Sequence, residues 1–418
     1  MSSVTDVLKG LPSASAWQER VYKDLHAHPE LSFHETRTAA LAATKLKELG
    51  YEVLEQIGRT GVIGTLRNGT GQTVLARADM DALPVEERTG LPYASTLTAT
   101  DDAGTAVGVM HACGHDVHVT CLLGAAELLA KARRSWSGTF VAVFQPAEEV
   151  AGGAKAMVKD GLRDRIPQPD VAFAQHVLAY PAGTVGTQAG PVLSAGDSIR
   201  ITLHGKGAHG SMPHNSVDPV VLAALAVLRL QTIVSRETKP GEFAVLTVGS
   251  SVAGSTSNII PDHAILLANL RTYDLSVRKR MIESIERMVK AECEASGAPK
   301  PPEFHYYDQY PLTDNDPEVT KRITAAFRSH FTAGTVFDIG HQTASEDFSD
   351  IPNALGTPYT FWGIGGIEAN KYERARAAGR VEQDIPVNHS EFFAPVIEPT
   401  LSTGTQALVV AALAYLAK

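Results

Sequence analysis

The stretch Thr139-Phe-Val-Ala-Val-Phe-Gln-Pro-Ala-Glu148-Glu149 runs from an apolar segment into two adjacent carboxylates. Residues 139–144 have the composition of a strand buried on both faces of a sheet. Open α/β sheets carry functional side chains at the carboxyl ends of such strands. Two neighbouring carboxylates repel each other unless a positive group lies beside them, and a metal ion fits that need best. The stretch therefore predicts an α/β sheet with a metal site at one edge.

A second stretch, His111-Ala-Cys-Gly-His-Asp116, supplies further ligand types. Together with His118 it places five potential ligands within eight residues. A thiolate and an imidazole on either side of Gly114 suit a transition metal, because glycine permits the backbone turn that aims both at one point. A single cysteine or histidine is more often a core or surface residue, but the clustering favours metal binding.

Two more predicted strands end in similar side chains. Residues 73–81 are apolar and end with Asp79 and Asp81, and residues 171–176 end with His176. Because the carboxyl ends of parallel strands meet at one edge of a sheet, we expect these side chains to belong to the same site.

The two adjacent carboxylates are expected to have different roles within this site. Side chains of neighbouring residues diverge along an extended backbone, so Glu149 can face a metal while Glu148 faces a substrate. With Cys113 and His115 as further ligands, Glu148 is left to handle protons. A metal ion and a spare carboxylate are the minimum equipment for hydrolysing an amide or an ester.

Composition limits the class of protein. The 418 residues exceed one ordinary core, so we expect more than one domain. The net charge of -9 and the lack of a run rich in lysine and arginine argue against nucleic acid as a partner. The first residues lack a secretory signal pattern, and we find no run of eighteen apolar residues typical of a membrane span. Three cysteines cannot all pair, which favours a reducing cytoplasm.

The pattern changes after about residue 193. Strand 198–204, helix 217–236, strands 243–252 and 264–272, helix 277–296 and a closing strand at 302–307 predict a compact α+β, ferredoxin-like module with two helices on one face. Helices at 14–28, 35–49, 116–131, 316–330 and 398–417 and strands at 51–55, 62–66 and 358–362 belong to the α/β part. We therefore predict that 1–192 and 309–418 form one catalytic domain, interrupted by a smaller domain at 193–308.

Seven motifs occur in the order that characterises one enzyme family. They are His26-Ala-His28-Pro-Glu30-Leu, Arg77-Ala-Asp79-Met-Asp81-Ala-Leu-Pro, His111-Ala-Cys-Gly-His115-Asp, Phe144-Gln-Pro-Ala-Glu-Glu149, Gly205-Lys-Gly-Ala-His209, Ser257-Asn258-Ile-Ile-Pro and Ser345-Glu-Asp-Phe348. In these motifs the chain resembles the M20 metallopeptidases, and most of all the branch with hippurate hydrolase, N-acyl-amino-acid amidohydrolases and hydrolases of indole-acetyl amino-acid conjugates. The resemblance implies a dimetal exopeptidase-like fold, with a mixed sheet covered by helices on both faces and a lid domain that forms a homodimer.

The resemblance also implies roles for individual residues. Two divalent ions, zinc, manganese, cobalt or nickel, are expected in each subunit. Glu148 matches the general base, and Asp81 matches a carboxylate that orients a ligand, although a capping role before the following turn stays open for Asp81. The matching ligands are Cys113 as the residue between the metals, His115, Glu149, His176 and His389, with His341 as an alternative late ligand.

Three residues of the middle domain match positions that act on the substrate: His209 a catalytic position, and Asn258 and Arg271 substrate-binding positions. His209 matches a histidine that reaches the partner subunit's site and polarises the scissile carbonyl, and His214 is the competing candidate. Asn258 and Arg271 match positions that hold the carboxylate of the substrate, for which a planar guanidinium is well suited. A plain surface role remains open for Arg271.

The sequence thus predicts a cytoplasmic dimetal amidohydrolase that cleaves N-acyl or N-aroyl amino acids, or dipeptides, as a homodimer or a higher homo-oligomer. We expect neither nucleic acid nor a membrane as a partner. Two alternatives stay open: a thiol hydrolase with Cys113 as its nucleophile, and a metal-loaded protein that binds amino-acid conjugates without cleaving them. The motif at Glu149 departs from relatives in one respect, since Val150-Ala151 intervene before two glycines.

Overall fold

The computed structural model describes residues 2–101 and 104–417, and the chain divides into two compact units. Unit 1 comprises Met1–Val192, Asp314–His341 and Asp347–Lys418, and unit 2 comprises Leu193–Thr313 and Gln342–Glu346. The predicted boundaries followed residues 192 and 308. The second boundary lies later in the structure because the last strand of unit 2 continues to Tyr310, beyond the expected end at 307. The return of 342–346 to unit 2 was not predicted.

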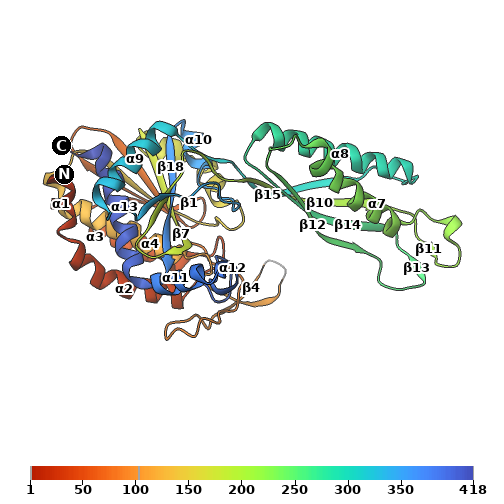
Figure 1. Cartoon of the computed structure of the whole chain (residues 1–418), viewed down its shortest axis with the longest axis horizontal. Helices are drawn as coiled ribbons and strands as arrows, with labels where there is room; N and C mark the ends of the chain where they lie inside the picture. The colour runs from red at the N-terminus through yellow and green to blue at the C-terminus, as the bar shows by residue number, and fades with distance from the viewer. Residues whose placement is uncertain (1, 102–103, 418) are drawn as a thin grey trace. The chain divides into compact units, whose positions relative to one another are not determined.

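A mixed sheet forms the centre of unit 1 (Figure 1). Its described strands, in spatial order, are β1 (Glu52–Ile57), β2 (Gly61–Asn68), β6 (Gly138–Gln145), β3 (Thr73–Asp79), β7 (Val171–Pro181), β18 (Tyr359–Ile367), β8 (Val185–Thr187) and β17 (Val336–Asp338). The central strands β6, β3, β7 and β18 are parallel, whereas β1, β2 and β6 pair antiparallel. The parallel strands are mostly apolar and buried along their first residues because both of their faces are covered, and their polar residues lie mainly toward the carboxyl ends.

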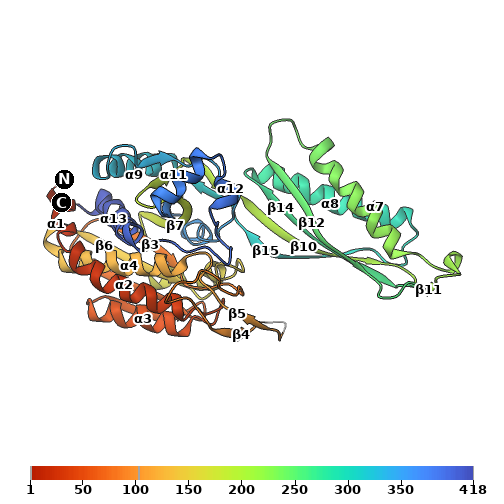
Figure 2. The same ribbon diagram turned by 60° about the horizontal axis from the view of Figure 1, so that its bottom comes forward.

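Helices cover both faces of this sheet, as predicted (Figures 1 and 2). The described α-helices of unit 1 are α1 (Ser2–Leu8), α2 (Leu11–Ala27), α3 (Thr36–Glu48), α4 (His115–Lys131), α5 (Gly153–Lys159), α6 (Leu162–Arg165), α9 (Pro317–His330), α10 (Asp350–Leu355), α11 (Ala369–Ala377), α12 (Val381–Asp384) and α13 (Ile397–Leu416). A short hairpin, β4 (Thr98–Thr100) with β5 (Ala106–Gly108), lies outside the sheet. A further two-stranded sheet joins β9 (Gly190–Leu193) to β16 (Thr313–Asn315).

Side chains of the central strands alternate between two environments. In β3, Ala76 and Ala78 belong to the main apolar core, which α4 and α13 complete. The intervening Arg77 faces the opposite side, where Asp347 lies before α10. One face of the sheet is therefore an apolar core, while the other carries a buried polar network close to the strand ends.

Unit 2 is a four-stranded antiparallel sheet with two helices. The chain order is β10 (Ala195–His204), α7 (Pro219–Thr232), β12 (Ala244–Ala253), β14 (His263–Thr272), α8 (Leu275–Ala295) and β15 (Glu303–Tyr310), and the spatial order of the strands is β12-β14-β10-β15. This is the ferredoxin-like arrangement that the sequence predicted. A small pair, β11 (Ala208–His209) with β13 (Ile259–Ile260), extends from it.

Three helices begin where the sequence supplies a capping aspartate. The Asp218 carboxylate accepts from the amide of Val220 at the start of α7, and Asp274 and Asp316 cap α8 and α9 in the same way. Proline follows Asp218 and Asp316, where its missing N–H costs no hydrogen bond. A short π-helix, Ile233–Glu237, continues α7. Of the described helices, this combined segment, Pro219–Glu237, alone is long and apolar enough to cross a membrane by length and composition, but its inner face packs in the core of unit 2.

Candidate metal centre

The predicted ligands of unit 1 meet at the carboxyl edge of its parallel strands. Cys113 lies just before α4, and His115 is the first residue of that helix. His176 lies in β7, and Glu149 follows β6. His389 comes from the loop after α12. Ligand atoms of Cys113, His115 and His176 lie within 4.8 Å of one another, and so do those of Cys113, Glu149 and His389. Cys113 belongs to both groups, so its sulfur lies between two sets of ligands.

Distances within the cluster suit donor atoms that converge on a shared cation. Glu149 Oε1 lies 3.7 Å from His115 Nε2, and Glu149 Oε2 lies 3.3 Å from His389 Nε2. His176 Nε2 lies 3.4 Å from Cys113 Sγ. Glu149 therefore reaches toward both groups, one oxygen to each.

The backbone around Cys113 needs glycine, as the sequence indicated. Gly114 has φ of 82°, in the left-handed region, and a Cβ there would lie 2.3 Å from Val177 Cγ1. The loop that carries His389 is held by its neighbour Asn388, whose side-chain amide donates to the carbonyls of Cys113 (3.1 Å) and Val177 (3.0 Å). His389, itself at φ of 71°, donates its backbone N–H to the carbonyl of Ala112. These bonds attach the late loop to the cluster.

Two buried atoms show that the cluster fits a metal. His115 Nε2 and Glu149 Oε1 are enclosed by protein without a hydrogen-bond partner among the described residues. Such orphaned polar atoms cost free energy unless a further group satisfies them. An imidazole nitrogen, a carboxylate oxygen and a thiol sulfur are the donor set of a divalent transition metal.

The electrostatics of the cluster indicate the same. Burial lowers the pKa of His115, but the charges of Asp79 and Asp81 raise it to about 10. Burial raises the pKa of the Cys113 thiol well above its ordinary value, and Glu149 and Glu148 add to that rise. Negative charge is therefore in excess at this point, and a bound cation would compensate it and displace the thiol proton.

Asp81 links two segments that carry ligands, at His115 and Glu149, to a third segment at Ser32. His115 Nδ1 donates to the Asp81 carbonyl (2.8 Å) and lies 3.2 Å from Oδ1. The other oxygen, Oδ2, accepts from Ser32 Oγ (2.7 Å) and from the backbone N–H of Glu149 (3.0 Å). Burial raises the pKa of Asp81, but the hydrogen bond and charge of His115 bring it below its ordinary value. The carboxylate fixes the tautomer of His115, so that Nε2 is the atom presented to the cluster.

Glu148 is buried, with 5% of its surface exposed, and its Oε2 lies 4.0 Å from His115 Nε2. Positive φ angles at Ala147 (48°) and Ala151 (49°) flank the two glutamates. The amide of Ala151 donates to the Glu148 carbonyl at 2.9 Å. The tight turn holds Glu148 beside the cluster while Glu149 enters it.

His118 was counted among the potential ligands of the sequence, but both of its nitrogens have other partners. Nδ1 lies against Asp79 Oδ1 at 2.5 Å, and Nε2 accepts from the backbone N–H of Val177 at 2.8 Å. Arg77 donates to Asp79 Oδ2 (2.6 Å) and to Asp347 (3.2 Å). Arg77, Asp79 and His118 thus form a buried network next to the ligand cluster.

A second buried ion group was not predicted. His26 Nδ1 lies 2.7 Å from Asp116 Oδ2, and Nε2 lies 3.0 Å from Glu87 Oε1. Burial lowers the pKa of His26, but its hydrogen bonds to Asp116 and Glu87 raise it to about 10, so the ring is charged. Asp116 directly follows His115, which connects this group to the first turn of α4.

The predicted catalytic His209 and the predicted substrate-binding residues Asn258 and Arg271 lie in unit 2. His209 pairs with Ile259, and the amide of Gly210 donates to the Asn258 carbonyl at 2.8 Å, so His209 and Asn258 are neighbours. His209 Nδ1 accepts from Ser211. Arg271 lies near the C-terminal end of β14, where its guanidinium donates to Ser345 Oγ and to Asn269 Oδ1.

Two further histidines were alternatives to predicted site residues, His214 to His209 and His341 to His389. His214 lies in the exposed turn Pro213–Asn215. His341 Nδ1 donates to the carbonyl of Pro191 (2.6 Å), and the ligand groups found among the described residues include His389 rather than His341.

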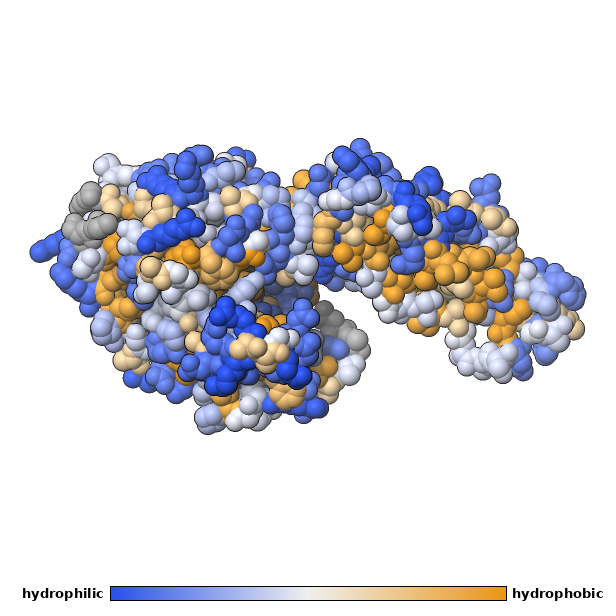
Figure 3. All heavy atoms as spheres, viewed as in Figure 1, coloured by the Kyte–Doolittle hydropathy of each residue, from blue (hydrophilic) through white to orange (hydrophobic). Residues whose placement is uncertain are grey.

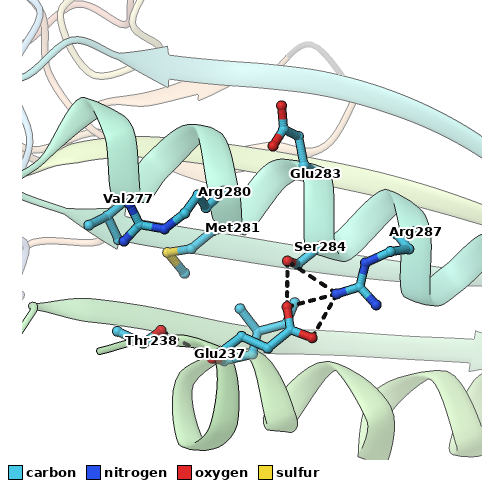
Figure 4. Close-up of a pocket in the computed structure, with 9 residues that line it drawn as sticks. Glu237, Thr238, Val277, Arg280, Met281, Glu283, Ser284 and Arg287 are labelled. Atoms are coloured by element: carbon cyan, nitrogen blue, oxygen red, sulfur yellow. Dashed lines mark hydrogen bonds and ion pairs between the residues drawn. The ribbon is translucent and has the colours of Figure 1, made fainter. Parts of the chain in front are cut away.

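A separate pocket in unit 2, between α8 and the turn after α7, has no such chemistry (Figure 4). Its volume is about 330 Å³. Arg287 donates to both oxygens of Glu237 (Figure 4). Arg280 donates to Glu242. The cations around the pocket are therefore already paired with carboxylates.

Comparison with known proteins identifies relatives along most of the chain. Residues 75–398 match the sequence model of peptidase family M20/M25/M40. Thermostable carboxypeptidase 1 of Saccharolobus solfataricus is 37% identical over 352 residues, which cover 83% of this chain and 86% of that protein. Hippurate hydrolase of Campylobacter jejuni is 42% identical over 280 residues, or 66% of this chain and 70% of the relative.

A solved structure shares the fold. A Bacillus subtilis protein described as a dinuclear metal binding peptidase from the M20 family superposes with a TM-score of 0.74 at 28% identity. The match covers 96% of this chain and 99% of that one. The sequence-based expectation of family and fold class is confirmed.

Proposed function

The chain belongs to peptidase family M20/M25/M40, and we propose from this premise that it is a metal-dependent amidohydrolase that releases amino acids from N-acyl or N-aroyl conjugates or from dipeptides. The observation that carries the proposal is the pairing of a ligand cluster with the adjacent carboxylate of Glu148. Hippurate hydrolase, with 42% identity, is a relative named for this chemistry.

Five residues are proposed to hold two divalent ions. Cys113 belongs to both ligand groups, and His115, Glu149, His176 and His389 would complete them. When bound, such ions polarise a carbonyl group and bring the pKa of water down toward about 7. The mixed donor set suits zinc, manganese, cobalt or nickel.

Glu148 is the group that moves protons. Its buried carboxylate lies beside His115 and is not a member of the two groups that contain Cys113. It takes a proton from the water that attacks the acyl carbon, and it passes that proton to the amide nitrogen as the C–N bond breaks. The water oxygen stays on the acid product, and the amine leaves with the proton.

The geometry of unit 2 supports a homodimer. Arg271 pairs with Gly196 at one end of β14, whereas His263 pairs with His204 at the other, close to β11 and β13. At about 3.3 Å per residue, the eight steps from 263 to 271 span roughly 26 Å. One small substrate cannot touch both ends, so Arg271 of one chain and His209 with Asn258 of another are proposed to share it.

An apolar surface on α7 supports the same proposal. Val221, Leu225 and Leu228 are 55%, 44% and 69% exposed, and Figure 3 shows apolar atoms gathered over this helix. The neighbouring strand β12 is an edge of its sheet, with Val252 59% exposed. Exposed apolar patches of this kind mark interaction sites. A cytoplasmic location is also proposed, because the three buried cysteines are unpaired and Cys113 must remain reduced to bind metal.

The decisive variant is Glu148→Gln, which keeps the shape of the side chain and removes its basicity. Purified protein is loaded with Mn²⁺ or Zn²⁺, and free amino acid released from N-benzoyl and N-acetyl amino acids is measured by mass spectrometry. We expect turnover to fall by about 10³-fold or more while metal content stays near that of the wild type. Glu86→Gln, at a side chain that is 76% exposed, is the control.

The same assay separates the alternative activities. A protein that only binds conjugates would release no amino acid in any form. A thiol hydrolase would stay active after complete chelation, but the raised pKa of Cys113 leaves little thiolate to act as its nucleophile. Full activity of Glu148→Gln would refute the assignment of the base.

A further inference from the structure

A pocket of about 280 Å³ opens in unit 1 beside Glu149. Its walls come from separate segments: Leu31 after α2, Leu83 and Pro84 after β3, Thr100 in β4, and Val150 after β6. The volume lies near the lower limit of small-molecule sites, about 300 to 1,000 Å³, so the pocket suits one part of a small molecule.

The lining of the pocket selects the chemistry of its occupant. Leu31 and Leu83 are half-buried, and Val150 is 43% exposed, so apolar surface is left for a ligand to cover. No lysine or arginine lines the pocket, but the carboxylates of Asp101 and Glu149 do. With Glu149 assigned to the metal, the remaining polar lining includes Asp101 and His34 but no ammonium or guanidinium group that would bind a free amino-acid carboxylate. The apolar surface therefore suits a neutral acyl group better.

The walls are held in place by the groups that orient the proposed metal ligands. The Asp81 carboxylate accepts from Ser32, next to Leu31, and from the amide of Glu149, next to Val150. The amide of Leu83 donates to the Met110 carbonyl at 3.0 Å. The pocket is therefore formed before a ligand binds, which raises the selectivity of a small site.

We propose that this pocket receives the acyl group of the substrate and favours aromatic or branched apolar acyl groups over acetyl. The inference rests on the proposed amidohydrolase function. Leu83 and Val150 are the specificity-determining residues. The charged end of the leaving amino acid lies outside the pocket. Glu149 belongs both to the ligand cluster and to the pocket wall, so an acyl group bound here is next to the proposed reaction centre.

The test compares acyl preference at constant leaving group. N-acetyl-alanine and N-benzoyl-alanine are hydrolysed by the wild type, by Val150→Phe, which fills the pocket, and by Leu83→Ala, which removes one wall. We expect each variant to lower kcat/KM for the benzoyl substrate by about tenfold or more, and to change the acetyl substrate by less than about threefold. Leu54→Phe, an exposed side chain on β1, is the control, and circular dichroism verifies that every variant is folded.

Two results would overturn the inference, and they differ from each other. Equal effects of Val150→Phe on both acyl substrates would remove the acyl assignment and leave the amidohydrolase intact. Lack of hydrolysis of every conjugate by metal-loaded wild type would remove both. A selective loss of benzoyl turnover in Val150→Phe and Leu83→Ala would support the proposal.

Discussion

Glu35 is a buried carboxylate that supports the site without touching a ligand. Its Oε1 accepts from the backbone N–H groups of Phe33 and Ala147, both at 2.8 Å, and its Oε2 accepts from Thr60. Ala147 begins the turn that carries Glu148. Burial, with a further contribution from the charge of Asp81, raises the pKa of Glu35 to about 7. The side chain therefore costs free energy when it ionises.

The sign of this effect predicts a pH dependence. A carboxyl whose pKa rises from 4.5 unfolded to about 7 folded contributes stability that is complete below pH 4.5 and is lost as the pH rises through 7. The shift corresponds to about 3 kcal/mol. Glu35→Gln cannot ionise, so its stability relative to the wild type should rise across this window. Urea unfolding at several pH values measures the difference, with Glu52→Gln, 73% exposed, as the control. A difference that does not change with pH would contradict the prediction.

Single residues also show what the sequence alone can predict. Gly114 was expected to turn the backbone between two ligands, and glycine's freedom at positive φ is a local property that needs no tertiary information. The role of His118 was not predictable, because its partners Asp79 and the Val177 amide come from two distant strands. Ligand chemistry is visible in a sequence, but the competition for each nitrogen is not.

At the scale of elements, His26 links α2 to the first turn of α4 and to the segment after β3. Its charged ring lies between the carboxylates of Asp116 and Glu87. Removal of the ring leaves two enclosed carboxylates without a counter-charge, which costs about 3–5 kcal/mol. His26→Ala should lower the free energy of unfolding by this amount at pH 7.

Chemical denaturation followed by circular dichroism measures the loss. His28→Ala is a matched control two positions later, because the side chain of His28 is 48% exposed. The control should change stability by less than about 0.5 kcal/mol. Equal effects of His26→Ala and His28→Ala would show that the buried group does not hold the elements together.

Elements with strong local patterns were predicted well. The apolar runs at 73–81, 139–144 and 171–176 became β3, β6 and β7, and their polar ends meet as expected at one edge. Contacts between α2 and α4 were not predicted, since His26 and Asp116 are ninety positions apart and no periodicity relates them. The pocket at Glu149 was equally invisible, because its walls come from segments that only the fold brings together.

At the scale of the whole molecule, the proposed dimer gives a test on α7. Leu228 is 69% exposed on its apolar face, and Leu228→Lys places a charge there. We expect the wild type to have the mass of two chains by light scattering and the variant to shift toward one. Turnover should fall with the dimer, because His209 and Asn258 would then be lost from the partner's site. Leu54→Lys, on β1 of unit 1, should change neither property. A wild type that is fully active as a single chain would contradict the shared site.

The order of the parts along the chain was visible in the sequence, because strand and helix patterns change near residue 193 and return near 316. The identity of the metals and the oligomeric state were not, since they depend on coordination geometry and on a surface between chains. Both properties are measured on the metal-loaded protein.

Anomalous scattering from a crystal of the metal-loaded protein tests the proposed centre most directly. We expect two metal peaks in each subunit, with Cys113 Sγ between them and with His115, Glu149, His176 and His389 as the remaining protein ligands. A single peak, no peak, or metals bound to other side chains would contradict the dinuclear centre and the hydrolytic function proposed from it.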